Sequence, residues 1–296
     1  MLYRAMTKLS DEETRIDVDL NVEAGKKPSD RNQAKVFIRQ TKELNFNILT
    51  GYLQKQHTWD RNTAAQFLEC MSFLDHLLRE LPSQRYTMIR KSFFQRGEQR
   101  FLLSGNIEAM KGAFASMRIV NNAPRGALLS VNVDVANGTF FCKLDLMDHL
   151  RTLLDARDVS DIQRQFNDAR NMKNKDGPVA FKHTDFFRKI KILHKLRVET
   201  KHRAGGFTIK RFIDKDCTQH SFEKDGKHIT VQKYFREVYN ISVMPGIPLV
   251  EAGNGTYIPA DVLRVPENQR YPFKLDPMQT SKVCLRFPTL CVDLVS

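Results

Sequence analysis

Two tyrosines in the segment Val-Gln-Lys-Tyr-Phe-Arg-Glu-Val-Tyr have side chains suited to binding a nucleic acid. Tyr234 and Tyr239 each combine an aromatic ring with a hydroxyl that needs a polar partner when it is buried. Lys233 and Arg236 interleave with them. Single-stranded nucleic acid is bound by rings that stack on bases and by cations that meet phosphates. Helical spacing also suits core packing, which we accept for Phe235, and on spacing alone core tyrosines are slightly favoured over a ligand pocket.

Two groups of carboxylates have the composition of a metal site. Asp17 and Asp19 lie on one face of an alternating segment, but a polar face opposite the core is what a half-buried strand requires. Asp145, Asp148 and His149 share a helix-like segment whose other face is apolar, so a solvated face is the better interpretation. Neither group predicts a nuclease.

Other catalytic and cofactor motifs are missing from the sequence. Neither Gly205-Gly206 nor Gly253-Asn-Gly255 leads into the Gly-Lys-Ser/Thr of a phosphate-binding loop. There is no His-Glu-x-x-His motif and no Cys/His zinc spacing. The five cysteines form no Cys-x-x-Cys pair and are typical of reduced thiols in an intracellular protein. We therefore predict no catalytic residue, metal or cofactor.

Charge is concentrated in one part of the 296-residue chain. Lys and Arg number 47 against 34 Asp and Glu, a net charge of +13. Residues 181–240 hold 15 Lys or Arg and 7 Asp or Glu, a net of +8. Such a field favours nucleic acid as a partner over a merely solvated basic face. No apolar run reaches the ~18 residues of a membrane helix, and the start lacks a signal segment, so we expect a cytoplasmic protein.

Hydrophobic spacing predicts an α+β protein. Residues 15–22 alternate as a half-buried strand, a second strand is expected at 35–39, and a helix starts with a Thr63…Gln66 capping box and ends before Pro82. Further strands are expected at 128–135, 192–200, 207–213 and 241–250, and further helices at 144–156, 162–172 and 231–239. The short strands after residue 190 predict a small barrel.

Several short motifs then occur in a fixed order. Those in the second half are Tyr234-Phe235, Met244-Pro-Gly-Ile-Pro248, Gly255-Thr-Tyr-Ile-Pro259, Asn268-Gln-Arg270, Lys274-Leu275 and Gln279-Thr280. Those in the first half are Leu81-Pro-Ser-Gln-Arg-Tyr-Thr87, Lys91-Ser-Phe-Phe94 and Val131-Asn-Val-Asp-Val135. The motifs between residues 234 and 280 resemble the second half of a PAZ domain. The motifs between residues 81 and 135 resemble the linker that precedes PAZ in a eukaryotic Argonaute. In the way that this sequence diverges from the family's usual motifs, it resembles a fungal quelling-type Argonaute.

The resemblance implies a pocket for the 3′ end of a guide RNA. Tyr234, Tyr239 and His202 match residues that meet the terminal phosphodiester, and Phe222 matches the aromatic that stacks on the last nucleotide. The other positions carried over are Thr256 and Ile258 as the floor, Phe207 where the family often has a tyrosine, Arg203 for a loop arginine, and Lys210, Arg211, Lys233 and Arg236 as supporting basic residues.

The resemblance also implies a domain order. We expect an N domain truncated at its start over residues 1–84, a β-rich first linker over 85–150, a PAZ domain over 151–280 built as a small β-barrel with an inserted αβ module, and the start of a second linker over 281–296. The N domain would assist duplex unwinding. The Mid and PIWI domains, which hold the guide 5′ end and cleave targets, are expected to be missing, so the chain would be a non-enzymatic part of a longer protein whose Mid-PIWI lobe is its partner. A Dicer-type nuclease fragment and a non-catalytic basic scaffold are the alternatives.

Overall fold

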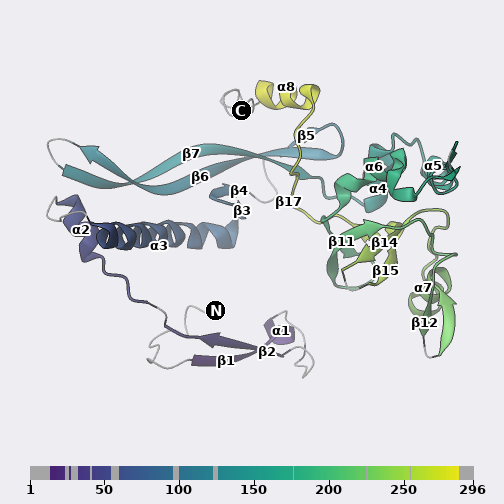
Figure 1. The fold of residues 1–296 in the computed structure, drawn as a ribbon, viewed down its shortest axis with the longest axis horizontal. Helices are drawn as coiled ribbons and strands as arrows, with labels where there is room; N and C mark the ends of the chain where they lie inside the picture. The colour runs from purple at the N-terminus through teal and green to yellow at the C-terminus, as the bar shows by residue number, and fades with distance from the viewer. Residues whose placement is uncertain are drawn as a thin grey trace. The chain divides into compact units, whose positions relative to one another are not determined.

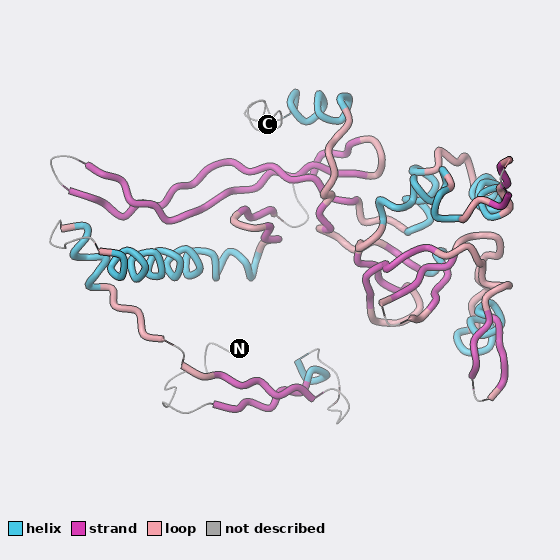
Figure 2. The backbone as a smooth tube through the Cα atoms, viewed as in Figure 1, coloured by secondary structure: helices cyan, strands magenta, loops and turns pink. Residues whose placement is uncertain are grey.

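The computed structural model describes residues 14–23, 27, 33–40, 42–54, 60–95, 100–122, 126–175, 177–224, 226–253 and 255–286. It divides into two compact units, one of Met1–Leu78 with Ser116–Asn132 and one of Arg79–Ala115 with Val133–Ser296. Helices and strands both contribute heavily, which confirms the α+β class (Figures 1 and 2). The bounds of the four predicted domains stay predictions.

The first unit begins with the antiparallel pair β1 (Thr14–Asp19) and β2 (Gln33–Ile38). The predicted strand 15–22 is too long, because the chain turns into the short helix α1 (Leu20–Glu23). As a result Leu20 and Val22, which the alternation assigned to a buried face, are both more than half exposed. Helix α2 (Asn47–Leu53) follows.

Helix α3 (Arg61–Arg85) is the longest helix. It begins at Arg61, two residues before the predicted cap Thr63, because the carboxylate of Asp60 accepts the free backbone N–H of Thr63 at 2.6 Å. The expectation that the helix ends before Pro82 is wrong, since Pro82 lies inside it and Tyr86 N still donates to Pro82 O at 2.9 Å. A proline removes one N–H donor without preventing its own carbonyl from accepting.

A six-stranded sheet forms the predicted β-rich linker. Its order is β17-β7-β6-β4-β3, with β5 paired to β6. The strands are β3 (Thr87–Ile89), β4 (Ser92–Phe94), β5 (Arg100–Leu103), β6 (Ile107–Asn122), β7 (Gly126–Phe141) and β17 (Gln269–Arg270). Strands β6 and β7 form the long ribbon of Figure 1. The predicted strand 128–135 lies within β7, and Phe94, Met110 and Phe140 pack together on this sheet.

Helices α4 (Leu146–Leu153), α5 (Val159–Arg170) and α6 (Asp185–Ile190) follow the sheet and pack on one another. The first two confirm the predicted helices at 144–156 and 162–172, although α5 begins earlier because Asp158 caps it. Between α5 and α6 lie β8 (Lys173–Asn174), β9 (Gly177–Pro178) and the 3-10 turn η3 (Phe181–His183). The first residues of the predicted strand 192–200 belong instead to the turn η4 (Lys191–Leu193).

The last third of the chain folds around a five-stranded sheet of order β15-β14-β11-β10-β16. Its strands are β10 (Arg197–Thr200), β11 (Gly206–Phe212), β14 (Leu249–Ala252), β15 (Tyr257–Pro259) and β16 (Leu263–Arg264). The predicted barrel does not close among the residues described. The edge strands β15 and β16 have three and two residues and are joined by the turn η5 (Ala260–Val262); β15 pairs with β14 and β16 pairs with β10, and no pairing between the two edges is found in the described chain. The predicted strand 241–250 becomes a strand only at Leu249, because the chain turns at Pro245 and Gly246, where the φ of Gly246 is 74°.

An αβ module is inserted between β11 and β14, as expected. It consists of the hairpin β12 (Ser221–Lys224) and β13 (Lys227–Thr230), followed directly by α7 (Val231–Tyr239), and Figure 1 shows it beside the sheet. One hydrophobic core joins this module, the sheet and helices α4 to α6. Helix α8 (Pro277–Arg286) ends the described chain, in which no helix is long and apolar enough to cross a membrane.

Candidate nucleic-acid interface

A cavity of about 280 Å³ lies where the inserted module meets the sheet. Its walls come from the loop after β10, from β12, from α7 and from the start of β15. The residues that line it are His202, Arg203, Phe222, Val231, Tyr234, Phe235, Tyr239, Gly255, Thr256, Tyr257 and Ile258. None of these described lining residues is acidic.

Helix α7 holds the two tyrosines at the cavity. Thr230 caps the helix by accepting the backbone N–H of Lys233 at 3.3 Å, which fixes where the helix begins. Val231 and Phe235, one turn apart, are 1% and 4% exposed and fasten one face to the core. Tyr234 and Tyr239 are half-buried beside that face, so their rings pack while their hydroxyls reach the cavity wall.

The two tyrosine hydroxyls form part of a short hydrogen-bonded chain. Arg203 Nη1 donates to the Tyr239 hydroxyl at 3.4 Å. A hydrogen bond joins the hydroxyls of Tyr239 and Tyr234, and with burial it raises the pKa of Tyr234, so Tyr234 is neutral at pH 7. The pair holds two hydroxyl protons and its mutual bond uses one. The other proton remains available to an anion in the cavity.

His202 lies against the same tyrosines. Its ring is 4.5 Å from the ring of Tyr239 and 5.2 Å from that of Phe235. Burial, with a smaller effect from the charge of Arg203, lowers the pKa of His202, so the ring is neutral at pH 7. Its Nδ1 is buried and has no hydrogen-bond partner among the residues described. A buried polar atom without a partner is costly unless a ligand satisfies it.

The aromatic surface of the cavity is contributed by Phe222 on β12. Its ring meets that of Tyr234 edge to face at 5.2 Å. The ammonium of Lys224, two residues along the same strand, lies 5.0 Å from the centre of the Tyr234 ring. Rings and a cation therefore adjoin, as stacking on a base next to a phosphate requires.

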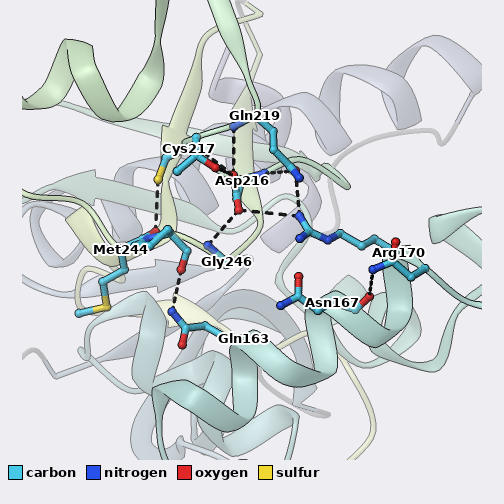
Figure 3. A network of polar contacts seen from close by, with 11 residues as sticks. Gln163, Asn167, Arg170, Asp216, Cys217, Gln219, Met244 and Gly246 are labelled. Carbon is cyan, nitrogen blue, oxygen red and sulfur yellow. Dashed lines mark hydrogen bonds and ion pairs between the residues drawn. The ribbon is translucent and has the colours of Figure 1, made fainter.

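The loop between β11 and β12, which leads into the strand of Phe222, is anchored by Asp216 (Figure 3). Its carboxylate accepts hydrogen bonds from the backbone of Thr218, Gln219 and Gly246. Burial alone would raise the pKa of Asp216, but these bonds and one from the Thr218 hydroxyl outweigh it, and the pKa is lowered. Arg170 of α5 lies 3.8 Å from the carboxylate. Asp216 thus ties the module to α5 as a charged group.

Seven of the eight predicted end-binding residues line this cavity, and the exception is Phe207. Its side chain packs against the core from a position opposite Val198 in β10. The four predicted supporting basic residues do not line it either. Lys210 and Arg211 pair with Glu251, Lys233 lies 3.7 Å from Glu237, and Arg236 is exposed on α7. The roles assigned to all twelve residues stay predictions.

The structure adds four lining residues that the sequence did not assign to the pocket, namely Val231, Phe235, Gly255 and Tyr257. Tyr257 lies between the two predicted floor residues Thr256 and Ile258. Consecutive side chains of a strand alternate between its two faces, yet Tyr257 and Ile258, the first two residues of β15, both line the cavity. An aromatic residue between two expected pocket residues was the available signal.

The two groups of carboxylates are otherwise engaged. Asp17 pairs with Arg15, Asp145 with Lys201 and Asp148 with Arg151. His149 is 1% exposed and its Nε2 donates to the carbonyl of Cys142 at 3.0 Å. Within the described ranges no three His, Cys, Asp or Glu side chains are grouped to hold a metal ion.

Comparison with known proteins gives two family matches. Residues 160–284 match the PAZ domain, and residues 88–141 match the Argonaute linker 1 domain. Protein argonaute of Schizosaccharomyces pombe is 28% identical over 255 residues, which cover 84% of this chain and 28% of that protein. Protein argonaute 1A of Oryza sativa subsp. japonica is 29% identical over 218 residues, covering 71% and 18%. The chain thus spans less than a third of the length of these relatives.

Among solved structures, the crystal structure of Kluyveromyces polysporus Argonaute with a guide RNA is similar to this chain. The match covers 88% of this chain and 30% of that chain. The sequence identity is 14% and the TM-score is 0.47. A structure of the Drosophila Argonaute 2 PAZ domain covers 32% of this chain at 17% identity and a TM-score of 0.26.

Proposed function

We propose that this chain, which belongs to the Argonaute family through its linker 1 and PAZ domains, binds the 3′ end of a small single-stranded RNA without cleaving it. The observation that carries the proposal is the cavity of about 280 Å³ with both donors and rings in its wall. A cavity of that size holds the end of a strand and has no room for a duplex. A free terminus enters it, whereas the interior of a strand does not.

The polar groups of the cavity favour a phosphate. Arg203 contributes a permanent positive charge, and the tyrosine pair has one hydroxyl proton to donate. Neutral His202 carries a buried nitrogen that no described residue satisfies. Each hydrogen bond to a charged group contributes about 1.5–3 kcal/mol. Two or three such bonds to one phosphodiester account for a specific site.

The apolar groups favour a base or a sugar at the terminus. Phe222 supplies an aromatic face, and Thr256, Tyr257 and Ile258 close the opposite side. Stacking of a base on an aromatic side chain contributes about 1–3 kcal/mol by alanine substitution and is tolerant of sequence. We therefore expect RNA ends of any sequence to bind.

Within the whole protein, this binding would anchor a guide RNA whose remainder lies along a Mid-PIWI lobe, in the cytoplasm. Assistance of duplex unwinding by the predicted N domain, residues 1–84, is a further part of the proposal. The rival functions are cleavage of the Dicer type and charge-driven scaffolding. A scaffold would bind any polyanion equally, and a nuclease would consume its substrate.

The test compares three RNAs with the same total number of nucleotides, and so with nearly equal charge. They are a duplex with a two-nucleotide 3′ overhang, a blunt duplex and a circular single strand. Fluorescence anisotropy should give the lowest Kd for the overhang, and gel analysis should recover every RNA intact. Equal affinity for all three would reject the 3′-end function in favour of a basic scaffold.

A further inference from the structure

Three side chains stand in one row across the sheet next to the cavity. Arg211 on β11 is opposite Glu251 on β14, and Glu251 is opposite Tyr257 on β15. Directly opposed residues on paired strands place their side chains on the same face. The outer member of the row, Tyr257, lines the cavity, whereas Glu251 and Arg211 do not.

Glu251 is a buried carboxylate at the centre of this row. It is 3% exposed and accepts hydrogen bonds from Lys210 Nζ at 2.7 Å and from Arg211 Nε. Its strand neighbours Leu249, Val250 and Ala252 are also buried, and all three are apolar. An apolar residue at position 251 would complete that strand, and burying an ion pair is weak evidence for stability. The charge therefore has another use.

The backbone is shaped to bring two cations to this one carboxylate. The pairing register of β11 and β14 shifts between Ile209 and Arg211, which leaves Lys210 as the extra residue of a β-bulge. Consecutive side chains of a regular strand point to opposite faces, and a bulge re-aims one of them. Lys210 and Arg211 consequently both reach Glu251 while their own side chains stay about half exposed, at 55% and 56%.

The row ends on Tyr257, which is held from two sides. A hydrogen bond links Arg211 to the hydroxyl of Tyr257, and it adds to the larger effect of Glu251 in raising the pKa of Arg211. The ring of Tyr257 packs on the ring of His220, with 4.1 Å between the centres. Fixing both the hydroxyl and the ring leaves the side chain one position in the cavity wall.

We infer that Glu251 is a positioning residue of the RNA-end pocket, which orients Tyr257 through Arg211 without touching the RNA. The inference rests on the proposed function and identifies what sets the geometry of one wall. In this arrangement the hydroxyl of Tyr257 is bonded to Arg211 within the protein, so the RNA contacts the ring of Tyr257 and not its hydroxyl. Loss of the carboxylate frees Arg211, and Tyr257 then adopts several positions, which costs affinity because the wall must be ordered again on binding.

The experiment is a double-mutant cycle on the overhang RNA. Glu251→Gln removes the charge at constant shape, and Tyr257→Phe removes the hydroxyl and keeps the ring. Each should raise Kd by roughly two- to tenfold, the range of one ordinary hydrogen bond. The Kd of the double variant should be no higher than the higher of the two single-variant Kd values, because both changes break the same chain of contacts. Independent, multiplying effects would overturn the inference, as would an unchanged Kd for Tyr257→Phe.

The matched control is Glu108→Gln in β6. Glu108 is likewise buried, at 4% exposed, and its carboxylate accepts from Arg100 Nη1 at 2.9 Å, but it lies away from the cavity. It should lower the melting temperature as Glu251→Gln does and leave the RNA Kd unchanged. An equal loss of affinity in the control would show that general destabilisation is at work and overturn the inference.

Tyr234→Ala separates this inference from the function on which it rests. If Tyr234→Ala weakens overhang binding and Glu251→Gln does not, the positioning role fails alone. If Tyr234→Ala has no effect, the end-binding function fails and the positioning role fails with it.

Discussion

Replacing Tyr234 tests whether this side chain is a ligand group or only part of the core. Its ring packs edge to face on Phe222 and Phe235, at 5.2 and 6.0 Å, and its hydroxyl is bonded to that of Tyr239. Tyr234→Phe keeps both ring contacts and leaves Tyr239 bonded to Arg203. The change therefore removes one donor from the cavity and little else.

The magnitude follows from those contacts. A hydrogen bond to a phosphate is worth about 1.5–3 kcal/mol, and ~1.4 kcal/mol is a factor of ten in Kd. Tyr234→Ala loses the donor and the ring contacts, so Kd for the overhang RNA should rise roughly tenfold or more by that conversion. Phe222→Ala should cost a similar factor through lost stacking, about 1–3 kcal/mol. Tyr234→Phe should show part of the loss.

The assay is fluorescence anisotropy with the overhang duplex and the blunt duplex, together with a melting curve for each variant. A pocket residue gives a loss that is specific to the overhang. A core residue gives a lower melting temperature and an equal loss on both RNAs, because only the folded fraction has changed. That second pattern for Tyr234→Phe would refute the assignment of its hydroxyl to the RNA. An RNA with a 3′ phosphate should bind worse than one with a free hydroxyl, since the cavity must accept added charge and bulk.

Three further predictions concern salt, pH and chemistry. The logarithm of the association constant should fall by about 1–3 for each tenfold rise in salt concentration, which is a shallow dependence. Each phosphate neutralised on a single strand contributes roughly 0.7 to this slope, and the cavity meets few phosphates. A much steeper slope would assign binding to the whole basic region. The pKa of His202 lies below its ordinary value of 6.5 in the free protein, and a bound phosphate raises it, so affinity should increase as pH falls from the RNA-bound pKa to the free pKa and then level off. His202→Asn should remove this dependence in titrations from pH 8 to 5, and His220→Asn, which changes a histidine packed on the outer ring of the wall, should keep it. Guide-paired target RNA should stay intact with Mg²⁺ or Mn²⁺, and metal-dependent cleavage that is abolished by changing Asp17 or Asp148 would contradict the non-enzymatic function.

The sequence was sufficient for elements whose signals are local. The helix of Tyr234 and Tyr239 has its apolar stripe and its bounds in nine consecutive residues, with its capping Thr230 directly before them, and it was predicted at 231–239 without error. Spacing was misleading where an element depends on its neighbours. Leu20 and Val22 continue an alternating pattern, but nothing covers them within the described chain once the backbone turns into α1.

The order of short motifs determined the family and most of the cavity, since a motif carries its residue roles with it. Tertiary structure alone decided which side chains share a space and which are already engaged. Lys210 and Arg211 are cations in the sequence, but a bulge and a buried carboxylate 40 residues further along the chain pair them with Glu251. Tyr257 was not assigned to the pocket from the sequence, yet it lines the cavity beside Thr256 and Ile258. Charge pairing and cavity walls are sums over contacts between distant segments, so composition and spacing do not encode them locally, and only the folded chain fixes them.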